Sequence, residues 1–199
     1  MPRFSRRMPA ATLSILLTTG IVTAMQFVIP GLLGALERNP DGIARHQWWR
    51  LISPLLVHND GWRQIAFDFP AIFITGSLAE RLYGPAKVLV IYFLCGLLGE
   101  VCGYAWQPHG AGSSIAGAGL LGALAFWLVV ENWILQGKFG GALLLAGAVV
   151  LTVLRDIHGP PLLTGACLAG LFRLWKPENN ATGFQRDDPV GYLPISLPI

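Results

Sequence analysis

The stretch that decides the fold lies at residues 110–130 and reads GAGSSIAGAGLLGALAFWLVV. It contains no Asp, Glu, Lys or Arg, and a second uncharged stretch extends over residues 8–36. A helix needs about 20 apolar residues to cross the hydrocarbon core of a bilayer. Both stretches therefore predict helices inside a membrane, and the first is entered directly from a glycine-rich turn.

The composition of the whole chain agrees with a membrane location. Hydrophobic residues make up 53% of the 199 residues, charged residues make up 13%, and the mean hydropathy is +0.54. The charged share is about half that of a typical soluble domain, which argues against a soluble cytosolic enzyme. The net charge is +3, and no basic run interleaved with aromatic residues indicates a nucleic-acid surface. The three cysteines form no CxxC pair and predict no disulfide framework.

Six apolar segments predict the fold class, which is an all-α, polytopic membrane protein with a bundle of six transmembrane helices. The chain then divides into a basic cytoplasmic N-terminal segment (1–9), a membrane domain (10–176) and a disordered cytoplasmic tail (177–199). A long loop is expected from Gly34 to Gly61. The expected spans are approximately residues 10–29, 62–82, 85–106, 113–130, 139–154 and 158–175.

The distribution of basic residues predicts the orientation of the bundle. With the N-terminus inside, the inner segments hold nine Lys and Arg residues and the outer segments hold five. Because cytoplasmic loops carry the excess of Lys and Arg, we expect both termini on the inner side of a plasma (inner) membrane.

Ionisable residues within the spans are candidates for function, because burying them in a bilayer is costly. Asp68 and Glu100 lie inside expected spans, and His158 with Asp156 lies at the membrane edge. Glu100 has no obvious partner in the sequence. Glu80 and Glu131 lie at inner ends of spans, where we expect them to be solvated or paired with Arg.

A serine and a histidine each begin a stripe of small residues. Ser114 is followed by small residues four and eight positions later, and His158 by small residues seven and eleven positions later. Such stripes let two helix backbones approach closely, so we expect Ser114 and His158 to meet at the outer ends of their helices. A serine hydroxyl needs an adjacent base to act as a nucleophile, and histidine is a suitable one. The alternatives are structural roles: Ser114 as a helix cap, and His158 as an interface residue.

With these residues the sequence resembles the rhomboid family of intramembrane serine proteases. The resemblance covers residues 48–170, and the order and spacing of its pieces are specific when taken together. The pieces are Trp49-Arg50, the Gly-x-x-x-Glu-x-x-x-Gly pattern of 76–84, Gly112-Ser113-Ser114 followed by Gly119-Leu120-Leu121-Gly122, and His158 with Gly165. Ile115 and Pro161 stand where the family usually has glycine.

The resemblance implies a rhomboid-like bundle with an active site below the outer surface. Ser114 would be the nucleophile and His158 the base, with Gly112 lining the site. Gln64 and Asp68 stand where the family has its His and Asn on the second span, which stabilise the oxyanion. Gln64 is expected to donate its amide N–H. A protonated Asp68 can donate as well, whereas an ionised Asp68 would oppose the oxyanion.

Three functions remain open at this point. The first is an intramembrane serine endopeptidase that cleaves membrane proteins in or near their transmembrane segments. The second is a catalytically inactive rhomboid-like protein that binds transmembrane clients, and the third is a small transporter that uses Asp68 and Glu100 as ion sites. The expected partners are transmembrane protein substrates and the lipid bilayer, with no nucleic acid, cofactor or metal.

Overall fold

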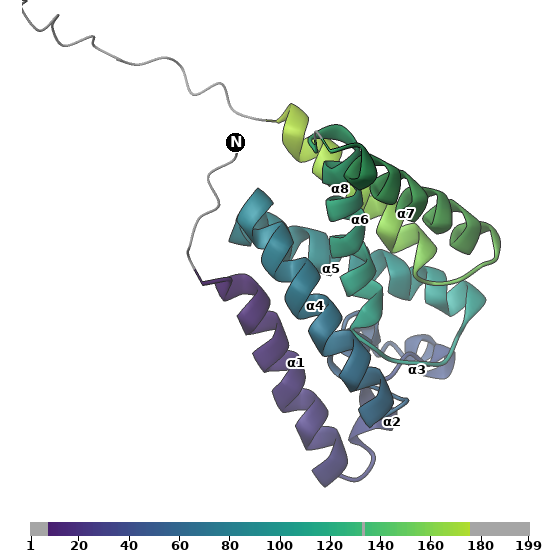
Figure 1. The fold of residues 1–199 in the computed structure, drawn as a ribbon. Helices are drawn as coiled ribbons and strands as arrows, with labels where there is room; N and C mark the ends of the chain where they lie inside the picture. Colours follow the sequence, from purple (N-terminus) through teal and green to yellow (C-terminus); the bar gives the residue numbers. More distant parts are fainter. Residues whose placement is uncertain (1–7, 133, 176–199) are drawn as a thin grey trace, which may run out of the picture.

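The computed structural model describes residues 8–132 and 134–175, and these residues form helices and no strand. Most of the predicted segment 1–9 and the whole predicted tail 177–199 lie outside the described residues. The helices are α1 (Ala10–Val28), α2 (Leu32–Leu36), α3 (Pro40–Ala44), η1 (Trp48–Leu51), η2 (Ser53–Leu56), α4 (Trp62–Tyr83), α5 (Pro85–Trp106), α6 (Ser114–Val130), α7 (Leu135–Val153) and α8 (Gly159–Leu174) (Figure 1).

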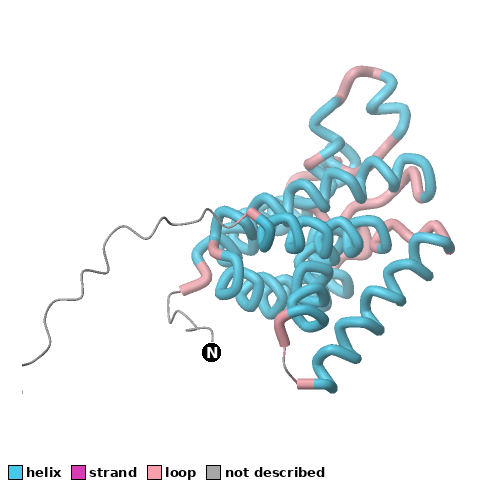
Figure 2. Tube along the Cα trace, turned by 90° about the horizontal axis from the view of Figure 1, so that it is seen from above, coloured by secondary structure: helices cyan, strands magenta, loops and turns pink. Residues whose placement is uncertain are grey.

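Six long helices match the six predicted spans, so the all-α class is confirmed. Within the described residues, only α1, α5 and α7 are both long and apolar enough to qualify as membrane spans on their own. α6 and α8 have 17 and 16 residues, and α4 carries four charged side chains. α7 begins four residues earlier than predicted, at Leu135, and lies at the edge of the bundle (Figure 2).

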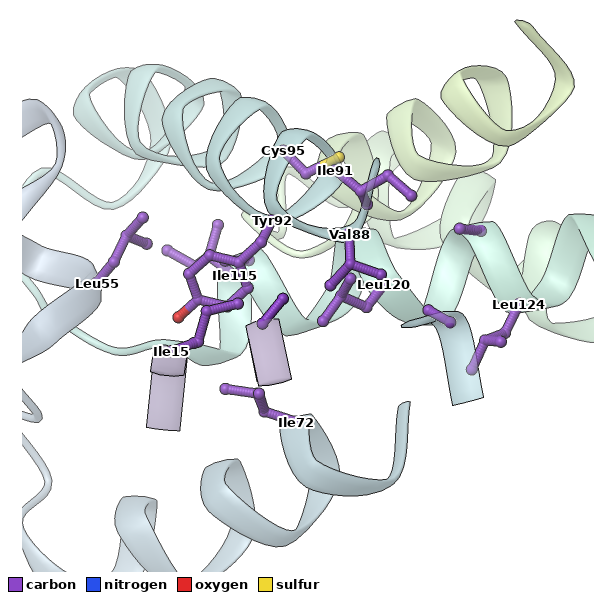
Figure 3. Close-up of a cluster of buried hydrophobic side chains, with 14 of the residues drawn as sticks. Ile15, Leu55, Ile72, Val88, Ile91, Tyr92, Cys95, Ile115, Leu120 and Leu124 are labelled. Carbon is purple, nitrogen blue, oxygen red and sulfur yellow. The ribbon is translucent and has the colours of Figure 1, made fainter. Parts of the chain in front are cut away.

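α6 is the central helix of the bundle, and α4, α5, α7 and α8 all pack against it. Its contact with α8 is backbone against backbone. A Cβ at Gly122 would overlap the carbonyl oxygen of Leu162, and one at Gly165 would overlap that of Gly119. The predicted packing of the two small-residue stripes is therefore confirmed. Figure 3 shows the buried core around α6, where Ile72 of α4, Tyr92 of α5 and Leu120 of α6 belong to one cluster of apolar side chains.

The segment expected to be a loop, Gly34 to Gly61, instead contains α2, α3, η1 and η2. A buried arginine holds it together: Arg50 donates to the carbonyl oxygens of Gly34 (3.0 Å) and Glu37 (2.7 Å) and to Gln47 Oε1 (2.6 Å). Burying a guanidinium is costly unless its donors are hydrogen-bonded, and here two backbone carbonyls and the Gln47 side chain accept from it. The loop expectation was wrong. The side chain of Asn39 caps the start of α3, and the bonds of Arg50 join the short helices to one another.

Glu100 has a partner that the sequence did not reveal. Its Oε2 atom lies 2.7 Å from Nη1 of Arg38, and both side chains are buried. Arg38 also donates from Nε to the carbonyl oxygen of Gln107 (2.9 Å) and from its backbone N–H to that of Gly110 (2.8 Å). The ion pair therefore attaches the outer segment to the glycine-rich turn that leads into α6.

Glu80 and Glu131 were both expected to be solvated or paired with Arg. This was wrong for Glu80, whereas Glu131 lies 3.6 Å from Arg173 as expected. Glu80 is buried and accepts hydrogen bonds from the backbone N–H groups of Ala11 (3.0 Å) and Thr12 (2.8 Å). The first N–H groups of a helix have no partner inside that helix, and its N-terminus attracts negative charge. Glu80 is therefore a cap that α4 supplies to α1.

Contacts between helix ends place the start of the first helix and the end of the last helix at the same end of the bundle. The start of α1 lies against the end of α4 through Glu80, and α5 begins there after Gly84. Lys87 near the start of α5 lies 5.2 Å from the ring of Phe172 near the end of α8. The start of α1 and the end of α8 therefore share one end of the bundle, and the starts of α6 and α8 lie at the opposite end (Figure 1).

Candidate active site

Ser114 is the first residue of α6, and His158 directly precedes α8. The distance between Ser114 Oγ and His158 Nε2 is 3.1 Å, which confirms the predicted contact. The start of α6 positions Ser114, and the start of α8 positions His158. The close glycine contacts between α6 and α8 hold these two helix starts next to each other. The pair has the geometry in which a histidine can accept a proton from a serine hydroxyl.

The two positions that depart from the family pattern pack on the same glycine. A Cβ at Gly99 of α5 would overlap Ile115 Cγ2 and would lie 2.7 Å from Pro161 Cγ. Gly99 therefore provides the space that the larger side chains after Ser114 and His158 need. Pro160 and Pro161 follow the first helical residue of α8, Gly159, where a missing N–H does no harm. His158 is the residue just before this helix begins.

A cavity of about 270 Å³ opens onto both Ser114 and His158. Most of the side chains that surround it are apolar or small, and they come from four helices. They are Asp68, Ala71, Ile72 and Thr75 of α4, Ser114, Gly117, Ala118 and Leu121 of α6, Leu151 of α7, and Leu162 of α8, together with His158. The cavity therefore joins a polar pair to a compartment lined mostly by apolar and small side chains.

Gln64 lies beside Gly112, the glycine two residues before Ser114. Its Nε2 atom donates to the carbonyl oxygen of Ala111 (2.9 Å), and its Oε1 atom accepts from the backbone N–H of Asp60 (3.3 Å). A Cβ at Gly112 would overlap Nε2 of Gln64 and would lie 3.5 Å from Ser114 Oγ. Only glycine leaves room here, so Gln64 and Ser114 reach the same recess. The amide nitrogen of Gln64 carries two hydrogens, so it has a second N–H besides the one that it donates to Ala111.

Asp68 is buried next to the backbone of Ser114. Its Oδ2 atom accepts from the Ser114 N–H (3.2 Å) and from the hydroxyl of Ser113 (3.5 Å). The same oxygen lies 3.4 Å from Nε2 of His58, which is fully buried. The carboxyl group of Asp68 therefore contacts a histidine and accepts a hydrogen bond from the backbone N–H of Ser114.

His58 and Ser113 form a buried network with Asp68 that sequence reasoning did not find. His58 Nε2 lies 3.0 Å from Ser113 Oγ, and His58 Nδ1 lies 3.0 Å from Thr23 Oγ1. Thr23 donates its own hydroxyl hydrogen to the carbonyl oxygen of Leu56, so Nδ1 of His58 carries a hydrogen. The only signal in the sequence was the position of His58 in the outer segment, because its partners lie on three other elements.

Asp156 contacts the ring nitrogen of His158 that faces away from Ser114. Its Oδ1 atom lies 2.8 Å from His158 Nδ1 and accepts the backbone N–H of His158 at 2.9 Å. Partial burial works to raise the pKa of Asp156, but these two hydrogen bonds and the charge of the ring outweigh it and leave the pKa below its usual range. The spacing of two residues between Asp156 and His158 was a signal present in the sequence.

Fold and site together define a membrane-embedded helical bundle with a Ser–His pair at a polar recess. The Rhomboid domain family matches residues 45–172, more than half of the chain, and the protein therefore belongs to the rhomboid family.

Several curated proteins are similar to it. The rhomboid protease GluP of Bacillus subtilis (strain 168) is 38% identical over 85 residues, which cover 42% of this chain and 17% of GluP. The putative rhomboid protease YdcA of the same organism is 32% identical over 133 residues, covering 63% of this chain and 66% of YdcA. The inactive RHOMBOID-like protein 8 of Arabidopsis thaliana is 27% identical over 110 residues, covering 54% of this chain and 30% of that protein. The chain thus spans less than two thirds of these relatives.

Proposed function

We propose that the protein is an intramembrane serine endopeptidase that cleaves other membrane proteins in or near their transmembrane segments. The observation that carries the proposal is the 3.1 Å contact between Ser114 Oγ and His158 Nε2 at the mouth of an apolar cavity. Membership of the rhomboid family and similarity to two rhomboid proteases support the same activity.

In the proposed reaction, Ser114 Oγ attacks the carbonyl carbon of the scissile peptide while His158 Nε2 takes the hydroxyl proton. The carbonyl oxygen becomes an oxyanion, which hydrogen-bond donors must stabilise. The backbone N–H of Ser114 and the amide N–H of Gln64 border the recess and are our candidate donors. His158 then protonates the leaving amine, and water hydrolyses the acyl-enzyme through the same histidine.

The proposal extends to the surroundings of the site. We place the protein in the plasma (inner) membrane with both termini of its membrane domain (10–176) on the cytoplasmic side. The Ser–His pair then lies toward the outer surface, because it is at the end of the bundle opposite the start of α1. Substrates are expected to present an apolar segment, since apolar and small side chains surround most of the cavity.

One observation favours a second candidate, a catalytically inactive rhomboid-like protein that binds transmembrane clients. The carboxyl group of Asp68 accepts the Ser114 N–H that an oxyanion would need. If the carboxylate stays there during the reaction, the oxyanion loses a donor and gains a repulsive neighbour. The third candidate, a transporter with Asp68 and Glu100 as ion sites, is not supported. Glu100 is paired with Arg38, and Asp68 contacts His58 and the Ser114 N–H.

The test is cleavage of a reporter with a transmembrane segment, co-expressed with the protein or with its variants. We expect cleavage by the wild type and none by Ser114→Ala or His158→Ala. Two exposed residues offer matched controls, Ser14→Ala in α1 and His109→Ala in the glycine-rich turn, and both should cleave normally. Undiminished cleavage by Ser114→Ala would refute the nucleophile. A wild type that neither cleaves nor reacts with a serine-directed probe, yet captures the reporter, would establish the second candidate.

A further inference from the structure

Both ring nitrogens of His158 are engaged, and the two engagements are chemically different. Nε2 lies 3.1 Å from the hydroxyl of Ser114, and Nδ1 lies 2.8 Å from Oδ1 of Asp156. A neutral imidazole has one nitrogen with a hydrogen and one without, and only the bare nitrogen can accept a proton. The group at Nδ1 therefore decides whether Nε2 can serve as a base toward Ser114.

We propose that Asp156 is a positioning residue that completes a Ser114–His158–Asp156 triad in this protein. The inference rests on the proposed function, because it assigns the residue that prepares its base.

The first argument is the tautomer. An ionised carboxylate can only accept hydrogen bonds, so a contact of 2.8 Å to Nδ1 requires that Nδ1 carries the hydrogen. The lone pair of Nε2 then points at Ser114. The second bond of Oδ1, from the backbone N–H of His158 at 2.9 Å, prevents the carboxylate from turning away.

The second argument is the local backbone. Between α7 and α8 the chain turns at Arg155, whose φ of +59° lies in the left-handed region that disfavours residues other than glycine. The Asp156 N–H donates to the carbonyl oxygen of Leu151 (2.8 Å), and its carbonyl oxygen accepts from Gly159 (3.2 Å). The turn thus carries Asp156 to the position where its carboxylate meets the ring.

The third argument is electrostatic. When His158 takes the proton of Ser114, the new imidazolium lies beside a carboxylate whose pKa is already below its usual range. The other acidic group near the site is Asp68 of α4, which is hydrogen-bonded to the backbone of Ser114. The side chains of His158 and Asp156 are 38% and 36% exposed, so water screens their attraction. We therefore expect a smaller effect than the ~10⁴-fold loss on removing the carboxylate of a buried triad.

A purely structural role must be separated from this one, because Asp156 also makes a turn with the backbone of His158. Asp156→Asn separates the two roles. Its Oδ1 atom can still accept the backbone N–H of His158, but the charge is lost. When the amide turns over, its N–H donates to Nδ1 instead, which favours the tautomer with the hydrogen on Nε2. We expect kcat to fall by about 10- to 100-fold, with KM and the unfolding temperature unchanged. The acid limb of the activity profile should move to lower pH. Asp41→Asn, the same change at an exposed position in α3, is the control and should alter none of these.

A second measurement does not depend on activity. In protein labelled with ¹⁵N-histidine in detergent micelles, the His158 signals are assigned by their loss in His158→Ala. We expect Nδ1 to be protonated and Nε2 bare at neutral pH, and a mixture of the two forms in Asp156→Asn. A hydrogen on Nε2 in the wild type, or an unchanged kcat in an active Asp156→Asn variant, overturns the role of Asp156. A wild type with the expected tautomer and no cleavage refutes the protease instead and leaves the positioning by Asp156 standing.

Discussion

Asp68 allows the sharpest test of how the site would stabilise an oxyanion, because its carboxylate holds the N–H that acyl transfer needs. The distance from the Ser114 nitrogen to Asp68 Oδ2 is 3.2 Å. We expect Asp68→Asn to raise the rate of cleavage about fivefold to tenfold.

The magnitude follows from the bond that must be given up. A hydrogen bond to a charged group contributes about 1.5–3 kcal/mol and one between neutral groups about 0.5–1.5 kcal/mol. If the Ser114 N–H turns to the oxyanion, the wild type loses the stronger bond and the Asn variant loses the weaker one. The difference of about 1–1.4 kcal/mol corresponds to about five- to tenfold in rate. Removing a negative charge next to the oxyanion acts in the same direction.

The assay is kcat/KM for a fluorogenic substrate with a transmembrane segment, measured with purified protein in detergent. Unfolding temperatures show whether each variant is folded, and Asp41→Asn again provides the matched change of charge. A large loss of cleavage in a folded Asp68→Asn variant would mean that the charge itself is needed, and our account of Asp68 would be wrong. A rate equal to that of the wild type would refute the magnitude.

Three further predictions address the donor, the helix contact and the cap. Gln64→Ala should lower kcat by about 10²–10³-fold if Gln64 donates to the oxyanion, and an unchanged rate would remove it from the site. Gly165→Ala should destabilise the protein by about 1–3 kcal/mol through overpacking, whereas Gly147→Ala, which meets open space in α7, should not; equal unfolding temperatures would contradict the close contact of α6 and α8. Glu80→Ala should cost about 2–4 kcal/mol of stability because it leaves buried donors of α1 unpaired, whereas Glu131→Ala in an exposed pair should cost less than about 1 kcal/mol. Denaturation in mixed micelles measures all four stability variants.

The sequence alone was sufficient for the helical class and for the positions of the six long helices. Apolar content over about 20 residues is a local property, and backbone groups in a bilayer must be bonded within the segment that carries them. The small-residue stripes of 114–122 and 158–169 were also local, and they predicted both the contact of two helices and the meeting of Ser114 with His158. The short helices within 34–61 escaped prediction because each has only four or five residues. The bonds that join them, such as that from Arg50 to a carbonyl group 16 residues away, form only in the folded chain.

Only the tertiary structure decided which polar groups meet. Arg38 and Glu100 are separated by 62 residues, and Glu80 lies 69 residues from the N–H of Ala11 that it caps. His58 and Asp68 come together from the outer segment and α4, and Ile115 and Pro161 are accommodated together by Gly99 of α5. A periodic pattern shows which face of a helix is apolar, but not which helix lies against it. The partners of buried charges depend on that packing, so the environment of Ser114 and His158 was determined by the fold.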